Sequence, residues 1–144
     1  SRVGALMESA HAILAGLDPS DEMAFAIRHG KLWSVHLNDQ NGLKYDQDKA
    51  FGSVDLRRAF NQVRVLEKND YGQRGEWVGL DVKAMRTQRR EVSFAHLKHS
   101  KETFLLLVEK ARSLDERALA QHIAARNYEE ADQLILRHLL GLKG

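Results

Sequence analysis

The stretch from Leu32 to Gly52 reads LWSVHLNDQNGLKYDQDKAFG and changes character once, just after Leu37. Its first part is mostly apolar and has the length and residue types of a short buried strand. The residues from 38 to 52 are polar and acidic and include Gly42 and Gly52, which is typical of a loop. The stretch therefore predicts a strand that leads into an acidic loop.

The segments on either side predict more strands and the helices between them. Short apolar runs at 3–7 and 77–82 have the composition of strands. Helices are expected after each of the first two strands, with Ser20 and Ser53 as their capping residues and apolar side chains along one face. Strands that alternate with helices of this length indicate parallel strand-helix-strand units, either doubly wound or from a barrel.

The C-terminal part of the chain predicts helices only. One helix is expected to begin at Ser100, where Glu102 follows, and two more at about 115–125 and 128–142. Because no strand pattern lies between them, this part is interpreted as a helical appendage.

Composition and charge exclude several classes of function. The 144 residues are 43% hydrophobic and 29% charged with one proline, which is typical of a globular, helix-rich protein. A net charge of +2 gives no strong field toward nucleic acid or an anionic membrane, and we expect neither as a partner. No stretch approaches the roughly 18 apolar residues of a membrane span. The lack of cysteine excludes thiolate metal sites and is compatible with a cytoplasmic location.

Each predicted strand ends close to an ionisable residue, and these are Glu8, His36 and Asp81. Three further candidates follow the first two strands: His11, Asp46 and Asp48. The carboxyl ends of parallel strands meet on one face of an α/β fold, where ligands bind. Carboxylates and imidazoles together suit Mg²⁺, Mn²⁺ or Co²⁺, and without a cation the carboxylates would repel one another.

Other interpretations of the polar residues are weaker. A calcium loop of the EF-hand type beginning at Asp46 needs Gly and Glu where Phe51 and Arg57 stand. A solvated loop is favoured over a phosphate site for the basic residues Lys83, Arg86, Arg89 and Arg90. Structural or surface roles are expected for the histidines of the C-terminal part, His96, His99, His122 and His138.

The acidic loop also carries a family resemblance. Lys44-Tyr45-Asp46-Gln47-Asp48, followed by Phe51-Gly52, resembles the metal-binding loop of xylose isomerases. Stretches similar to that family lie before and after it, at residues 8–17, 30–32, 55–60, 81–83, 86–87 and 139–141. The resemblance covers nearly the whole chain.

The resemblance implies a fold and an assembly. Residues 1–98 would be the C-terminal part, about three βα units, of a TIM barrel, and residues 99–144 a helical arm that clasps a neighbouring subunit of a tetramer. The chain would then be a fragment whose partner is the remaining N-terminal part of the barrel. The isolated fragment is expected to be inactive, and the complete protein to be an aldose-ketose isomerase of carbohydrate metabolism.

The resemblance also implies roles for the six candidates around two divalent cations. Glu8 would bridge both cations. His36 and Asp81 would join it at the cation that grips the oxygens of a small sugar, while His11, Asp46 and Asp48 would hold the second. The catalytic group would be Glu8, His11 and Asp48, serving a hydride shift between C1 and C2, with Asp48 accepting a proton from water.

His36 departs from the family pattern, since xylose isomerases have Asp where this chain has His, and the related rhamnose isomerases place a His. An imidazole in place of a carboxylate removes one negative charge and adds a nitrogen ligand, which predicts Mn²⁺ or Co²⁺ over Mg²⁺. The alternatives are a rhamnose isomerase-like or epimerase activity of the same barrel, or a non-catalytic metal- or sugar-binding assembly module.

Overall fold

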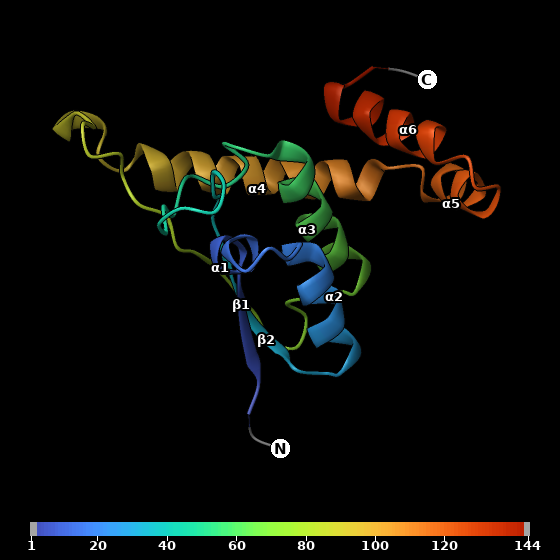
Figure 1. Ribbon diagram of the computed structural model, residues 1–144, viewed down its shortest axis with the longest axis horizontal. Helices are drawn as coiled ribbons and strands as arrows, with labels where there is room; N and C mark the ends of the chain where they lie inside the picture. The colour runs from blue at the N-terminus through green and yellow to red at the C-terminus, as the bar shows by residue number, and fades with distance from the viewer. Residues whose placement is uncertain (1–2, 143–144) are drawn as a thin grey trace.

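The computed structural model describes residues 3–142, which form three parallel strands and six α-helices (Figure 1). The strands are β1 (Ala5–Glu8), β2 (Leu32–Leu37) and β3 (Trp77–Leu80), and they form one sheet in the order β1-β2-β3. Their carboxyl ends are in register, because Glu8 lies beside His36 and His36 beside Gly79. The predicted α/β architecture with parallel strands is confirmed, as an open sheet of the described residues.

Helices follow each strand. In chain order they are α1 (Ser9–Leu14), α2 (Pro19–Arg28), α3 (Leu56–Lys68), α4 (Ala95–Ser113), α5 (Glu116–Ala124) and α6 (Tyr128–Leu140), with a 3₁₀ turn at Arg90–Val92 before α4. The predicted C-terminal run of helices is confirmed within the described residues. No helix among residues 3–142 is long and apolar enough to cross a membrane.

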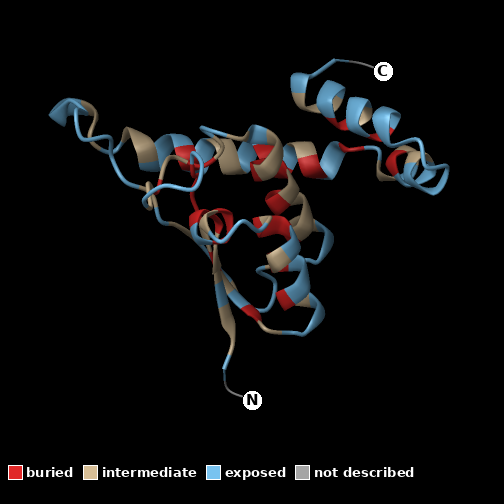
Figure 2. Ribbon diagram, in the orientation of Figure 1, coloured by how far each residue is buried: buried red, intermediate tan, exposed pale blue. Residues whose placement is uncertain are grey.

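The core lies between the sheet and helices α2 and α3. Val35 and Leu37 of β2 are fully buried, as are Met23 of α2 and Phe60 and Val63 of α3. Figure 2 shows buried positions in red on α2 and α3. Burial of each side chain of this kind contributes roughly 1.5–3 kcal/mol. This layer fixes β2, and with it the strand ends that carry the candidate ligands.

The opposite face of the sheet is largely open. Leu6 of β1 and Trp77 of β3 both neighbour Ser34 in the register, so all three share a face. Leu6 is 50% exposed and Trp77 76% exposed. Parallel sheets are normally covered on both faces, so this face lacks the second layer that such a sheet usually has.

The C-terminal helices dock on α3 of the same chain. Arg64 of α3 donates from Nη2 to Glu116 of α5 at 2.7 Å, and Lys68 donates to the same carboxylate at 2.9 Å. Arg57 contacts Asp132 of α6 at 3.0 Å. Figure 1 shows α5 beyond the C-terminal end of α4, with α6 running back from it. The role of this tail as an intersubunit arm stays a prediction.

Two predicted helix caps are wrong, because in each case an aspartate two residues away from the serine caps the helix. Asp18 caps α2 by accepting a hydrogen bond from the amide of Ser20, which lies inside the helix, at 2.8 Å. Asp55, not Ser53, caps α3 and accepts from the amide of Arg58 at 2.9 Å. A carboxylate is as good a cap as a hydroxyl, so residue type alone did not separate them.

Helix α4 begins at Ala95 rather than at the predicted Ser100. Ser100 is fully buried inside the helix, where its hydroxyl donates to the carbonyl of His96 at 2.6 Å and accepts from the amide of Phe51 at 3.0 Å. A serine that bonds back to the residue four positions earlier is compatible with a helix interior. Ser100 therefore ties the acidic loop to α4 instead of capping the helix.

Candidate metal centre

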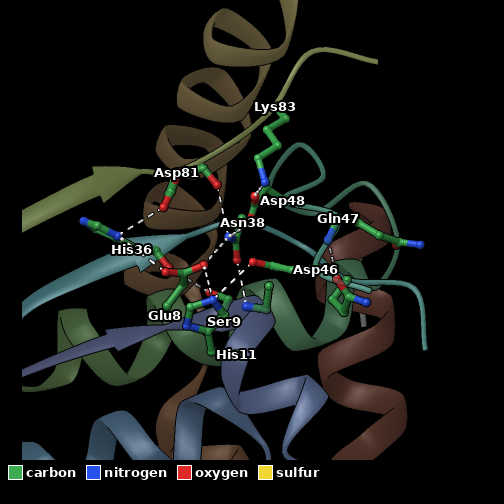
Figure 3. A network of polar contacts seen from close by, with 12 residues as sticks. Glu8, Ser9, His11, His36, Asn38, Asp46, Gln47, Asp48, Asp81 and Lys83 are labelled. Carbon is green, nitrogen blue, oxygen red and sulfur yellow. Dashed lines mark hydrogen bonds and ion pairs between the residues drawn. The ribbon is translucent and has the colours of Figure 1, made fainter. Parts of the chain in front are cut away.

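Three candidate ligands meet at the carboxyl ends of the strands (Figure 3). Glu8 is the last residue of β1, His36 lies near the end of β2, and Asp81 directly follows β3. Nδ1 of His36 lies 3.6 Å from Oε2 of Glu8 and 3.5 Å from Oδ2 of Asp81. One ligand atom from each residue lies within 4.8 Å of the others, which is close enough to hold one cation. We call these three the strand-end group.

A second group forms around the other oxygen of Glu8. His11 lies on α1, and its Nε2 is 3.4 Å from Oε1 of Glu8. The same nitrogen is 3.2 Å from Oδ2 of Asp46. Glu8, His11 and Asp46 form the loop group, again with ligand atoms within 4.8 Å of one another. Glu8 thus presents one carboxylate oxygen to each group.

The loop that carries Asp46 is folded around a buried glutamine. Nε2 of Gln40 donates to the carbonyls of Gly42 at 2.9 Å and Tyr45 at 3.0 Å. Its Oε1 accepts from the amide of Gln47 at 3.0 Å. Gln40 is 1% exposed, so these three bonds are shielded from water and hold the loop in one conformation.

Asp48 stands beside both groups but belongs to neither. Its side chain is 4% exposed and forms an ion pair with the ammonium group of Lys83. The hydrogen bond and charge of Asp48 raise the pKa of Lys83. Asp48 also has a positive φ of 44°, a conformation that costs a non-glycine residue energy and tends to occur at functional sites.

The prediction of a solvated loop is confirmed for Lys83, which in addition forms an ion pair that the sequence did not predict. The side chain of Lys83 is 63% exposed, yet its ammonium group forms an ion pair with Oδ2 of the buried Asp48. Lys83 follows Asp81 by two residues in the loop after β3, where the alternation of side chains along a strand no longer applies, so no direct signal of this contact was available in the sequence.

Two buried polar residues that sequence reasoning missed complete the cluster. Asn38 lies two residues after His36, and its side-chain amide contacts the carboxylates of Glu8 and Asp48, as Figure 3 shows. Ser9, the first residue of α1, donates to Oε1 of Gln62 on α3 at 2.6 Å and to the carbonyl of His36 at 3.3 Å, which ties α1, β2 and α3 together. For Asn38 the signal was the two-residue alternation from His36.

The donor set suits a divalent cation. Although the side chain of Asp46 is partly exposed, its Oδ1 is buried and has no hydrogen-bond partner among the described residues. A buried carboxylate oxygen without a donor is costly unless a cation contacts it. Carboxylate oxygens with imidazole nitrogens are ligands for Mg²⁺, Mn²⁺ and Co²⁺, so the residues present fit such an ion.

Comparison with known proteins shows that the chain is similar in sequence to xylose isomerases. The chain is 36% identical over 128 residues to the xylose isomerase of Thermus thermophilus, a match that covers 88% of this chain and 32% of that protein. It is 35% identical over 130 residues to the xylose isomerase of Thermus caldophilus, covering 90% of this chain and 33% of the relative. The chain is related to the xylose isomerases. No protein family model matches it.

The relation to xylose isomerases confirms the resemblance seen in the acidic loop. The chain spans about a third of the length of the curated xylose isomerases it matches. Its candidate ligands therefore belong to a segment that, in a xylose isomerase, is accompanied by about twice as many further residues.

Proposed function

We propose that this chain provides one side of the two-cation site of an aldose-ketose sugar isomerase. The observation that carries the proposal is the shared carboxylate of Glu8, whose two oxygens face two separate ligand groups in a relative of the xylose isomerases. Two cations held there would act as Lewis acids and would orient neighbouring oxygens of a small sugar for a hydride shift between C1 and C2.

The proposed roles follow from position. Glu8, His36 and Asp81 would hold the cation that binds substrate oxygens. His11, Asp46 and Asp48 would hold the second cation, together with the other oxygen of Glu8. Asp48 is the proposed proton acceptor at the second cation. The carboxylate of Asp48 is buried and close to both ligand groups. A cation in place of the Lys83 ammonium group would leave this carboxylate beside the reacting oxygens of the sugar. We also propose that His36, as an imidazole, favours Mn²⁺ or Co²⁺ over Mg²⁺.

Further residues are needed to complete the site. Each group offers three ligands, whereas Mg²⁺ and Mn²⁺ usually take about six, so substrate, water and other side chains must fill the rest. The exposed sheet face with Leu6 and Trp77 is the proposed contact for the remaining N-terminal part of a TIM barrel. The helical tail is the proposed contact with a second subunit of a homo-oligomer.

A chimera tests the proposal. The matched 128 residues of the Thermus thermophilus xylose isomerase would be replaced by the corresponding residues of this chain, and aldose-to-ketose conversion measured with Mn²⁺. We expect turnover that is lost in the Asp48→Asn chimera, with substrate binding retained. The matched control is Asp21→Asn, because Asp21 is exposed on α2 and belongs to neither ligand group.

Two outcomes would count against this function. A chimera that folds, binds Mn²⁺ and gives no turnover would remove the isomerase assignment. A chimera whose turnover is unaffected by Asp48→Asn would remove Asp48 from the reaction. Mn²⁺ binding by the 144-residue chain itself provides an independent reading should the chimera fail to fold.

A further inference from the structure

We propose that Asn38 is a positioning residue that holds the shared carboxylate of Glu8 and the carboxylate of Asp48 at a fixed separation. The meaning of this arrangement for cation binding rests on the proposed function. The arrangement itself rests on the hydrogen bonds of Asn38, which join three segments of the cluster.

The amide of Asn38 is buried and held in one orientation. The residue is 1% exposed and lies directly after β2. Its Oδ1 accepts a hydrogen bond from the backbone amide of Ala10 on α1 at 2.8 Å. Because Ala10 offers a donor, the oxygen of Asn38 must face α1, and the NH₂ group must face the carboxylates.

The NH₂ group then contacts three acceptors from different parts of the chain. Nδ2 lies 3.1 Å from Oε1 of Glu8, 3.1 Å from Oδ1 of Asp48 and 3.0 Å from the carbonyl oxygen of Asp81, so its two N–H groups are shared among three acceptors (Figure 3). These acceptors lie at the end of β1, in the acidic loop and directly after β3. Asn38 is thus the point through which the loop carboxylate and the strand ends are held together.

Only a side-chain amide can both accept a hydrogen bond from Ala10 and donate to the carboxylates at this position. Aspartate would accept from Ala10 but would place a third carboxylate against Glu8 and Asp48, which like charges disfavour. Leucine has a similar volume but would leave the Ala10 amide without the acceptor it has here and would take one hydrogen-bond donor from each of the two carboxylates. Glu8 gains a definite orientation from this contact, with Oε1 held toward Asn38 and Oε2 left toward His36.

The first test needs no metal. The 144-residue chain would be unfolded thermally in EDTA as wild type, Asn38→Asp, Glu8→Gln and the double variant. Asn38→Asp turns the donor into an acceptor, and Glu8→Gln supplies a new donor opposite it, so the two changes restore a hydrogen bond of reversed direction. We expect the double variant to regain at least half of the melting temperature lost in Asn38→Asp. A double variant no more stable than Asn38→Asp, or equally unfolded, would overturn the proposal.

The second test measures cation affinity directly. Asn38→Ser keeps a small polar side chain but cannot reach all three acceptors, and Mn²⁺ binding would be followed by the EPR signal of free Mn²⁺. Loss of residues that orient metal ligands typically weakens affinity roughly 10–100-fold, and we expect a loss in that range. The control is Asn41→Ser, since Asn41 is exposed in the same loop.

The two tests separate the two claims. Equal Mn²⁺ affinities of Asn38→Ser and wild type would overturn the positioning role. A wild-type chain that binds no Mn²⁺ would instead count against the proposed function, and the rescue experiment would still decide whether Asn38 holds Glu8 and Asp48 together.

Discussion

The ion pairs that hold the helical tail on α3 predict how much stability the carboxylate of Glu116 contributes. The hydrogen bond from Arg64 is the largest influence on Glu116, followed by burial, which opposes it, and by Lys68; together they lower the pKa of Glu116 from 4.5 to about 2. A difference of about 2.5 pKa units corresponds to at most ~3.4 kcal/mol of stability. Because the side chain is 34% exposed, screening by water reduces this, and we expect Glu116→Gln to cost ~1–2 kcal/mol at pH 7.

The pH dependence of this loss has a definite sign. The pKa of Glu116 is lower in the folded chain, so its contribution is fully present above about pH 4.5 and is lost as the pH falls toward about 2. Urea unfolding at pH 7 and at pH 2.5 should therefore show a clearly larger difference between wild type and Glu116→Gln at the higher pH. Glu109→Gln is the control, because Glu109 is exposed on α4. Equal losses at both pH values, or no loss at pH 7, would refute the docking of α5 on α3.

Three shorter predictions concern the cluster and the loop. His36→Asp should raise the affinity for Mg²⁺ relative to Mn²⁺ in calorimetric titrations, because it restores a hard oxygen ligand; an unchanged ratio would contradict the role of the imidazole. Lys83→Met should tighten Mn²⁺ binding, since the ammonium group no longer competes for Asp48, and weaker binding would contradict that competition. Gly52→Ala should lower the free energy of unfolding by about 1–3 kcal/mol in urea, because φ is +75° and the new Cβ would lie 2.9 Å from Cγ2 of Thr103; a loss below about 0.5 kcal/mol would show that the loop adapts.

The order of the elements could be predicted because hydrophobic runs record burial. Val35 and Leu37 are apolar since α2 and α3 cover them, and that pattern is visible in the sequence. The helix starts could not be placed as well, because Asp18 and Ser20 are both good caps and only the backbone path selects between them.

Part of the candidate site could likewise be predicted from the sequence, and part could not. Parallel strands in register bring Glu8, His36 and Asp81 together, so knowledge of the strands was enough to expect the strand-end group. The position of Asp48 depends on the path of the loop around Gln40, which no local pattern encodes. Its contact with Lys83 joins two loops and required the three-dimensional structure.

The shared carboxylate of Glu8 is the central claim, and Mn²⁺ titration of the 144-residue chain tests it most directly. Wild type, Glu8→Gln and the control Asp21→Asn would be compared by EPR of free Mn²⁺ and by calorimetry. Because Glu8 offers one oxygen to each ligand group, we predict that Glu8→Gln weakens every Mn²⁺ site of the chain at least tenfold, while Asp21→Asn binds as wild type does. Mn²⁺ binding by Glu8→Gln that equals wild type in number of sites and affinity would contradict the claim.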